Sequence, residues 1–420
     1  MSEWKETTLA DLCTDISYGY TESAKQEKVG PKFLRITDIA SGRLEWDKVP
    51  YCLINESDFE KYKLLPGDIV IARTGATTGA NYTIKESDPK DVVFASYLIR
   101  YKINPQIAYP YYIGQLLKSP NWSDYVDAIA GGSAQPGANA KQLGSFDIIL
   151  PPLPEQKAIA SILSCLDDKI DLLHRQNATL EKMAETLFRQ WFVERESLNY
   201  DSNDFYDGHE FKNQGNQPNQ KNQGSDNVEE TKEEWEEGTL GDVIEIYDNL
   251  RVPLSKMERD KKKDGQLYPY YGAAQIMDYI NDYIFDGEYI LLGEDGTVRT
   301  DEGYPVLQYA TGKFWVNNHT HVIRAKQPYN NFFIWNYLKK KNIDEIVTGA
   351  VQPKINQANL KSIDFPKYPE NLVIEFNKIS ELFFKKINQN KTQIRTLTAL
   401  RDTLLPKLMS GEVRVNNDFE

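Results

Sequence analysis

The chain has 420 residues, of which 40% are hydrophobic and 26% are charged, so it holds enough apolar material for two or three folded domains. It has no run of eighteen apolar residues, and its first residues lack the apolar core of a secretion signal, so we expect a cytoplasmic protein that does not enter a membrane. The net charge of −13 and three widely spaced cysteines (Cys13, Cys52 and Cys165) exclude a strongly basic protein and a disulfide framework.

The first elements along the chain indicate a mixed α/β region. Strands are expected at 68–74, 92–103 and 146–151, and a short helix is expected at 109–119. The first strand leads into the turn signal RTGATTGAN, whose glycines let the backbone approach a ligand closely.

A long helix is predicted after the Pro-rich segment at residue 151. Its apolar residues recur at steps of seven, a spacing that is typical of a coiled coil: Ile159, Leu166, Leu173, Leu180 and Leu187. At ~1.5 Å per residue, 159–191 would form a rod of roughly 50 Å. The alternative is an ordinary core helix, although core helices rarely keep such a row over five repeats.

An acidic segment follows this helix. Thirteen acidic and four basic residues lie between positions 194 and 237, so this segment carries −9 of the net charge. It is rich in Gly, Asn and Gln and cannot bury enough apolar surface to fold, so we predict a flexible linker. The remainder of the chain carries only −4 and can still present a basic face.

The second half of the chain repeats the first. WEEGTLGD at 235–242 matches WKETTLAD at 4–11, and GAVQPKINQANLKSID at 349–364 matches GSAQPGANAKQLGSFD at 132–147. Strands are expected at 288–295 and 321–325, and a helix at 331–341.

A second long helix closes the repeat. Its seven-step row contains Phe376, Phe383, Leu397 and Leu404, with Asn390 between them. Two matching apolar rows in one chain most simply pack on each other as an antiparallel or pseudo-symmetric coiled coil, in which Asn177 and Asn390 would fix the register.

Several motifs resemble those of one known family, the specificity (S) subunits of type I DNA restriction–modification systems. The matching segments are LPPLPEQKAIASIL (150–163), FRQWF (188–192), RVPLSK (251–256), YPYYGA (268–273), DYIFDGEYILLGEDG (282–296), NNHTHVIRA (317–325), VQPKINQANL (351–360) and LLPKLMSGEVRV (404–415). The first half departs from this pattern, since it lacks counterparts of YPYYGA and NNHTHVIRA.

The resemblance implies an α/β fold with two mixed α/β target-recognition domains, separated by two long helices that form an antiparallel intramolecular coiled coil. The expected boundaries are target-recognition domain 1 at 1–150, spacer helix 1 at 151–196, an acidic linker at 197–232, target-recognition domain 2 at 233–367, spacer helix 2 at 368–410 and a C-terminal tail at 411–420.

The resemblance also implies a function. Each domain would bind one half of a bipartite double-stranded DNA target, and the helices would fix the spacer and bind two methyltransferase subunits. Restriction/translocase subunits would join this complex for cleavage. No cofactor is expected on this chain, whereas S-adenosylmethionine, ATP and magnesium are expected on the partner subunits.

DNA binding requires cations for the phosphates and amide or hydroxyl groups for the base edges. Candidates in the first domain lie in two loops: Arg73, Thr74, Thr77, Thr78, Gln135, Asn139 and Lys141. Candidates in the second domain also lie beside turn signals: Arg251, Tyr270, Tyr271, Arg299, Asn318, His319, Gln352, Lys354 and Asn356. For each of these residues a solvated loop or a purely structural turn remains the alternative.

The sequence gives no support for catalysis by this chain. It has no GxxxxGK phosphate loop, and no Ser or Cys lies in a recognisable nucleophile–His setting. His319 and His321 alternate along an expected strand, so they would point to opposite sides, and no metal site is expected. A coiled-coil scaffold that joins proteins without reading DNA remains the alternative function.

Overall fold

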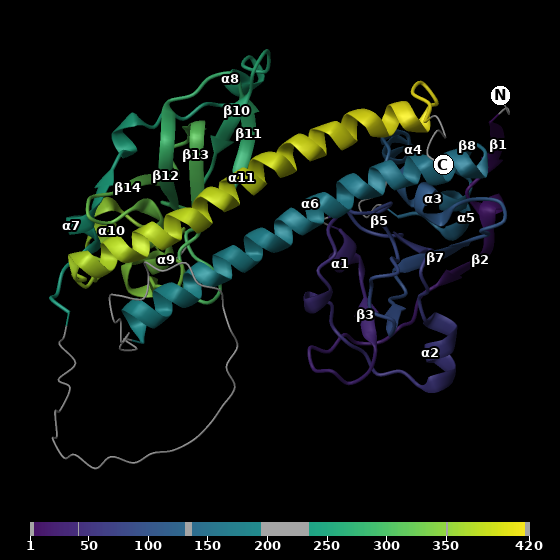
Figure 1. Ribbon diagram of the computed structural model, residues 1–420, viewed down its shortest axis with the longest axis horizontal. Coiled ribbons are helices and arrows are strands. Elements are labelled where there is room, and N and C mark those ends of the chain that lie inside the picture. The colour runs from purple at the N-terminus through teal and green to yellow at the C-terminus, as the bar shows by residue number, and fades with distance from the viewer. Residues whose placement is uncertain (1–3, 41, 131–136, 195–234, 350–351, 416–420) are drawn as a thin grey trace, which may run out of the picture. The chain divides into compact units, whose positions relative to one another are not determined.

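The computed structural model describes residues 4–40, 42–130, 137–194, 235–349 and 352–415. Its contacts divide the chain into two compact units (Figure 1). Unit 1 comprises Met1–His174 with Lys391–Glu420, and unit 2 comprises Arg175–Asn390, so each unit holds one α/β domain and a segment of each long helix. The predicted linker at 197–232 and the candidate Gln135 lie outside the described residues.

Unit 1 is built on a four-stranded antiparallel sheet with the strand order β2-β7-β4-β5, an antiparallel pair β1–β8 and a parallel pair β3–β6. Its strands are β1 (Lys5–Thr8), β2 (Cys13–Tyr18), β3 (Lys32–Leu34), β4 (Asp68–Ala72), β5 (Asn81–Thr83), β6 (Val92–Phe94), β7 (Leu98–Ile103) and β8 (Asp147–Leu150). Its helices are α1 (Ile36–Ile39), α2 (Glu56–Tyr62), α3 (Pro110–Leu116), α4 (Pro120–Ala130), α5 (Ala140–Gly144) and the first part of α6 (Leu153–Phe188).

One predicted strand of this unit is wrong. The segment 92–103 forms two strands, β6 and β7, because a turn at Ala95 interrupts it, where the Leu98 N–H donates to the Ala95 carbonyl at 2.8 Å. β6 pairs with β3, whereas β7 lies between β2 and β4. A continuous apolar run therefore covers two separate strand pairings, which apolar periodicity alone does not distinguish.

Unit 2 contains one six-stranded sheet with the order β11-β10-β13-β12-β14-β9. Its strands are β9 (Ile244–Ile246), β10 (Tyr268–Tyr271), β11 (Ile276–Ile280), β12 (Phe285–Gly293), β13 (Leu307–Val316) and β14 (Thr320–Ala325). Its helices are α7 (Leu240–Val243), α8 (Lys256–Asp260), α9 (Asn331–Leu338), α10 (Gln357–Lys361) and the first part of α11 (Glu370–Met409), and α6 continues as a π-helical turn at Arg189–Val193.

The repeat seen in the sequence is also a repeat of backbone pairing. In unit 1 Thr8 pairs with Asp147, and in unit 2 Thr239 pairs with Asp364, which are the residues that the two sequence matches align. The next hydrogen bond is shared as well. The Leu9 N–H donates to the Phe146 carbonyl at 3.0 Å, and the Leu240 N–H donates to the Ile363 carbonyl at 2.8 Å. In both units, this pairing holds the first segment of the repeat (4–11 or 235–242) beside the segment that leads into a long helix.

The two long helices pack against each other antiparallel within each unit. In unit 1 the apolar core includes Leu163 of α6 together with Leu405 and Leu408 of α11. In unit 2 the Phe188 ring of α6 contacts the Phe376 ring of α11, with their centroids 5.6 Å apart. Each helix segment also packs on the domain of its own unit, so the fold is α/β with an antiparallel intramolecular coiled coil, as predicted.

Two rows of residues on α6 form the seam, and the predicted apolar row is the less buried of the two. Ile159 and Leu173 are buried, whereas Leu166, Leu180 and Leu187 are half-buried. The row four residues later is buried at every position: Leu163, Ile170, Asn177, Ala184 and Trp191. On α11, Phe376 is buried, whereas Phe383, Leu397 and Leu404 are half-buried. The seam therefore follows alternating steps of three and four, which is the usual spacing of a coiled coil.

A polar pair lies inside the seam of unit 2. Asn390 Nδ2 donates to Asn177 Oδ1 at 2.9 Å, and the two residues are 0% and 7% exposed. A buried amide pair forms this bond only when the two helices are aligned in one register, whereas apolar neighbours tolerate a shift. The prediction that these two asparagines lie in the seam is confirmed.

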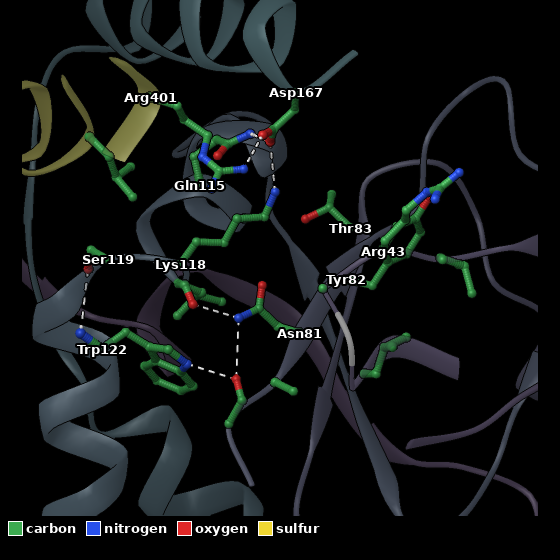
Figure 2. A pocket seen from close by; sticks show the side chains of 18 of the residues that line it. Arg43, Asn81, Tyr82, Thr83, Gln115, Lys118, Ser119, Trp122, Asp167 and Arg401 are labelled. Atoms are coloured by element: carbon green, nitrogen blue, oxygen red, sulfur yellow. Dashed lines mark hydrogen bonds and ion pairs between the residues drawn. The ribbon is translucent and has the colours of Figure 1, made fainter. Parts of the chain in front are cut away.

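A network of charged and amide side chains joins α6 and α11 to the domain of unit 1 (Figure 2). Asp167 accepts hydrogen bonds from Gln115 Nε2 at 2.9 Å, Lys118 Nζ at 3.0 Å and Arg401 Nη1 at 3.0 Å. Burial raises the pKa of Asp167, but the Lys118 charge and these hydrogen bonds lower the pKa to about 2. The carboxylate lines a cleft of about 590 Å³ and serves as an attachment point for the domain.

Two further expectations concern the whole chain. The three cysteines are free thiols, Cys52 being buried and Cys165 exposed. Among the residues described above, no helix combines the length and the apolar character that crossing a bilayer requires.

The asparagine pair generates a test of the seam. Asn390→Leu is expected to lower the free energy of unfolding by about 1–3 kcal/mol, because it leaves the Asn177 amide buried without a partner. Asn177→Leu combined with Asn390→Leu removes both amides and is expected to recover this loss or exceed it. Urea unfolding followed by circular dichroism measures both variants. Equal stability of the single and double variants would contradict a paired role for these residues.

Candidate nucleic-acid interface

Four segments of unit 2 meet beside the predicted loop NNHTH. The Asn317 N–H donates to the Tyr271 carbonyl at 3.1 Å, and the Glu294 N–H donates to the His319 carbonyl at 2.9 Å. The Ile355 N–H in turn donates to the Glu294 carbonyl at 2.8 Å. These bonds bring together the end of β10, the end of β12, the β13–β14 turn and the loop before α10. We refer to these four segments as the unit 2 loop cluster.

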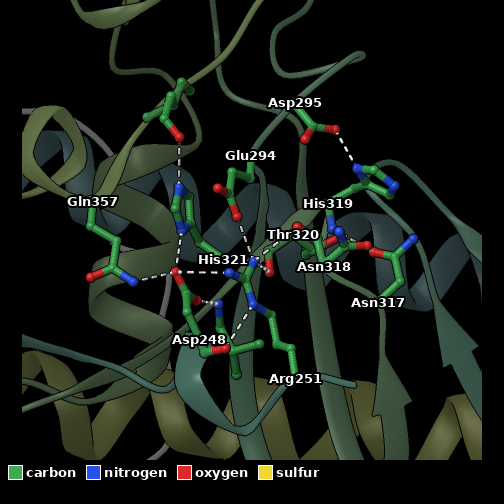
Figure 3. Close-up of polar contacts among 12 residues, drawn as sticks. Asp248, Arg251, Glu294, Asp295, Asn317, Asn318, His319, Thr320, His321 and Gln357 are labelled. Atoms are coloured by element: carbon green, nitrogen blue, oxygen red, sulfur yellow. Dashed lines mark hydrogen bonds and ion pairs between the residues drawn. The ribbon is translucent and has the colours of Figure 1, made fainter. Parts of the chain in front are cut away.

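A buried pair of side chains supports the unit 2 loop cluster (Figure 3). His321 is 0% exposed; its Nδ1 lies 2.6 Å from Asp248 Oδ2, and its Nε2 lies 2.8 Å from the Ile355 carbonyl oxygen. Both ring nitrogens therefore face acceptors, an arrangement that a doubly protonated ring satisfies. Asp248 also accepts from Gln357 Nε2 at 2.8 Å and from the Val322 N–H at 2.9 Å. The pair thus holds the Ile355 carbonyl in place, directly after Lys354 in the chain.

The groups around Asp248 change the pKa of its carboxyl group. Burial raises the pKa of Asp248, but the hydrogen bond from His321, the Val322 N–H and the Arg251 charge together hold the pKa below its ordinary value. Because the folded pKa is lower than the unfolded one, the carboxylate stabilises the fold fully above its unfolded pKa. That stabilisation is lost as the pH falls through the folded pKa.

Arg251 makes a second set of mostly buried polar contacts in unit 2. Its Nη1 donates to Glu294 Oε2 at 2.6 Å and to the Thr320 carbonyl at 2.7 Å, and the side chain is only 12% exposed. The other oxygen of Glu294 lies 3.4 Å from Lys354 Nζ, whose side chain is 50% exposed. Glu294 therefore connects a buried cation to one that reaches solvent.

Three of these residues bring potential metal-ligand atoms close together. Ligand atoms of Asp248, Glu294 and His321 lie within 4.8 Å of one another. However, Arg251 lies among them, 2.6 Å from Glu294 and 3.6 Å from Asp248. A metal ion would have to displace this guanidinium, and His321 already directs both ring nitrogens at other acceptors. The donor set does not fit a metal ion.

The remaining candidates of unit 2 fall into exposed and buried groups. The exposed or partly exposed candidates are Arg299, which pairs with Asp344, and Asn318, His319, Gln352, Lys354 and Asn356. The His319 side chain is 48% exposed, and its Nδ1 lies 2.5 Å from Asp295 Oδ1. His321 points into the core while His319 faces solvent, so the predicted opposite orientation of the two rings is confirmed.

Three candidates of unit 2 are not available to DNA as the structure places them. Tyr270 is 1% exposed, and its hydroxyl accepts from the Leu254 N–H at 2.9 Å. Tyr271 is 9% exposed and belongs to the apolar core. Arg251 is engaged by Glu294 and backbone carbonyls. The two rings lie on opposite faces of β10, and both faces are covered, since Tyr270 packs with Ile280 and Trp315 and Tyr271 packs with Phe285 and Phe314.

Two asparagine candidates cap short helices. Asn139 Oδ1 accepts from the Gln142 N–H at 2.9 Å, and Asn356 Oδ1 accepts from the Asn359 N–H at 2.8 Å. These bonds begin α5 and α10 and satisfy backbone donors at each helix start. The structural explanation that the sequence left open, a residue that shapes a turn, therefore accounts for both asparagines.

The candidates of unit 1 come from two loops that meet. Thr74 pairs with Gly137, and the Ala138 N–H donates to the Arg73 carbonyl at 2.9 Å. The Arg73 guanidinium lies over the Tyr18 ring, 5.1 Å from its centroid. Thr77 is half-buried, Thr78 donates to the Gly75 carbonyl at 2.7 Å, and Lys141 is exposed. We refer to these loops, with the exposed Tyr97, as the unit 1 loop cluster.

Sequence reasoning missed several residues of these clusters. Asp248 and Gln357 lie 73 and 36 positions from His321, so no local spacing indicates that they meet. Exposed Gln275 and Met277 follow YPYYGA, and Asn317 Nδ2 lies 3.6 Å from Met277 Sδ. Asp295 and Tyr97 fall inside the segments 288–295 and 92–103, for which the sequence predicts only strands.

The family model and the related proteins found by comparison point to the same family. Residues 1–182 and 232–374 match the family described as "Type I restriction modification DNA specificity domain". The type I restriction enzyme MjaIX specificity subunit of Methanocaldococcus jannaschii is 29% identical over 371 residues, which cover 83% of this chain and 76% of that protein. A Haemophilus influenzae chain assigned to the type I specificity subunits is 38% identical over 140 residues, but the match spans only 35% of its length and 33% of this chain.

A solved structure with a related fold covers most of the chain. The crystal structure of the type I restriction–modification system S subunit from M. genitalium has a TM-score of 0.60 and 18% sequence identity, and the match covers 96% of each chain. At this level of identity the likeness supports the fold and not the identity of any contact residue.

The buried pair under the unit 2 loop cluster generates a stability test. Asp248→Asn is expected to lower the free energy of unfolding at pH 7 by about 1–3 kcal/mol, because the buried His321 ring loses its charged acceptor. The difference from the unsubstituted chain should shrink as the pH falls below the ordinary carboxyl pKa of 3.8. Urea unfolding at several pH values measures this, with Asp286→Asn, an exposed carboxylate of β12, as the control. A difference that does not change with pH would contradict the ionic role.

Proposed function

We propose that this chain, which belongs to the family of type I restriction–modification DNA specificity domains, recognises DNA with two reading surfaces, one in each unit. The unit 1 loop cluster would read one half of a bipartite double-stranded target, and the unit 2 loop cluster would read the other. The observation that carries this proposal is the duplication itself. Each unit brings loops that are distant in sequence to one place, and both halves match the family.

The exposed groups of the two clusters are suited to this task. Lys141 and Lys354 supply cations for phosphates, and Gln352, Asn318 and His319 supply donors and acceptors for base edges. The chemistry of the two clusters differs, since unit 1 presents threonines and tyrosines where unit 2 presents amides and a histidine. Different side chains on a shared backbone support two different half-sites, as a bipartite and asymmetric target requires.

We also propose that this chain directs catalysis by partner subunits and performs none itself. Two methyltransferase subunits would bind S-adenosylmethionine and methylate adenine, and restriction/translocase subunits would use ATP and magnesium for cleavage. In support, the charged residues clustered in unit 2 pair with one another and leave no nucleophile–base arrangement among the described residues of that cluster.

The alternative of a scaffold that does not read DNA is not favoured. A scaffold function would explain the helices but would not explain why loops converge in both units. The family match also extends over both α/β domains and is not confined to the helices.

Methylome sequencing tests the proposed function. A host that carries this chain together with its methyltransferase partner should show one bipartite adenine-methylation motif, and deletion of this chain alone should remove it. The same host without the methyltransferase is the control for modification from other sources. A motif that persists after deletion of this chain would contradict the proposed function.

A further inference from the structure

The two loop clusters share a backbone framework that the repeated sequence segments show only in part, since they align 137 with 354 but do not include 74, 97, 295 or 319. Thr74 pairs with Gly137 in unit 1, and Asp295 pairs with Lys354 in unit 2. The glycines that follow, Gly75 and Gly296, have φ angles of 82° and 79°, in the left-handed region that favours glycine. Thr74 and Asp295 therefore occupy equivalent positions, and so do Gly137 and Lys354.

The same framework makes Tyr97 equivalent to His319. The Arg73 N–H donates to the Tyr97 carbonyl at 3.1 Å, and the Glu294 N–H donates to the His319 carbonyl at 2.9 Å. The carbonyls of Arg73 and Glu294 each accept one further bond, from Ala138 at 2.9 Å and Ile355 at 2.8 Å. One backbone arrangement thus carries a tyrosine in unit 1 and a histidine in unit 2.

Both side chains at this position are presented to solvent. Tyr97 is 58% exposed, and the His319 side chain is 48% exposed. Both rings are therefore free to contact another molecule. Exposure alone would fit many partners. The contact between His319 and Asp295 narrows the chemistry of the groups that His319 can bind.

Asp295 fixes which nitrogen of His319 carries the proton. An ionised carboxylate only accepts hydrogen bonds, so the 2.5 Å contact between Asp295 Oδ1 and His319 Nδ1 requires a proton on Nδ1. In the neutral ring Nε2 is then an acceptor. A phosphate oxygen is also an acceptor, so the neutral ring offers it no hydrogen bond through this nitrogen. The exocyclic amines of adenine and cytosine in the major groove are suitable donors.

We propose that His319 is a specificity-determining residue that accepts a hydrogen bond from adenine N6 or cytosine N4 in the half-site read by unit 2, and that Tyr97 holds the equivalent position for the other half-site. This inference rests on the proposed function. It adds which base edge unit 2 recognises and which residue, Asp295, orients the His319 ring. Asp295 is the positioning residue, because it acts through the His319 ring.

Asp295→Asn provides a direct test because the asparagine amide can donate to the ring, whereas the carboxylate only accepts from it. The asparagine Nδ2 can donate to Nδ1 of His319, which moves the ring proton to Nε2 and makes that nitrogen a donor. A donor suits guanine O6 and N7 or thymine O4. The complex with its methyltransferase partner, assayed on duplexes randomised at the second half-site, should shift its preference at one position from adenine or cytosine to guanine or thymine by about tenfold. The first half-site should not change.

Three further variants complete the experiment. His319→Ala should relax discrimination at the same position by about tenfold, and it decides the result if the Asp295→Asn complex is inactive. Tyr97→Ala should relax one position of the other half-site only. Asp286→Asn, which removes an exposed carboxylate outside the loop cluster, should leave the motif unchanged.

The outcomes separate this inference from the proposed function. If Asp295→Asn and His319→Ala retain the base preference of the unsubstituted chain, the inference is wrong while the bipartite reading stands. If His319→Ala weakens methylation equally for all bases, His319 makes a phosphate contact and the inference is also wrong. If duplexes are methylated without regard to either half-site, the proposed function itself fails.

Discussion

The antiparallel pairing of α6 and α11 is the constraint on which the rest of each unit depends. In unit 2 the buried bond between Asn177 and Asn390 forms in one register only, so it selects one alignment among the several that apolar residues alone would accept. That alignment places Phe376 against Phe188 and completes the core of the domain. In unit 1 the same role falls to apolar contacts near Leu163 and to the ion pair of Asp167 with Arg401.

The two units show how one framework carries two chemistries. Ile99 of unit 1 pairs with Ile71 on the neighbouring strand, and at the corresponding place in unit 2 His321 pairs with Leu292. A buried isoleucine therefore maintains the framework in unit 1, so the charged network of Asp248 and His321 is not needed to form the strands. Besides its bond to the Val322 N–H of β14, the pair holds the loop before α10, where His321 lies against the Ile355 carbonyl next to Lys354.

The sequence predicted the elements that depend on periodic apolar residues and on duplication. The two long helices, their antiparallel pairing, the buried asparagines and most strands follow from spacing and from the repeated segments. The side chains of the loops were less predictable, because their environments depend on residues far apart in sequence. Arg251 and Tyr270 had the chemistry of DNA contacts but lie inside the fold, and Asn139 and Asn356 cap helices. The partnership of His319 with Asp295 required the structure.

Matched heptad insertion tests most directly whether the paired helices set the distance between two reading surfaces. Seven residues inserted into α6 and seven into α11 at facing positions preserve both apolar rows and lengthen the pair by about 10 Å. At about 3.4 Å per base pair, the unread spacer of the methylated motif should grow by about three base pairs while both half-sites stay the same. Altered half-sites with an unchanged spacer would contradict the account.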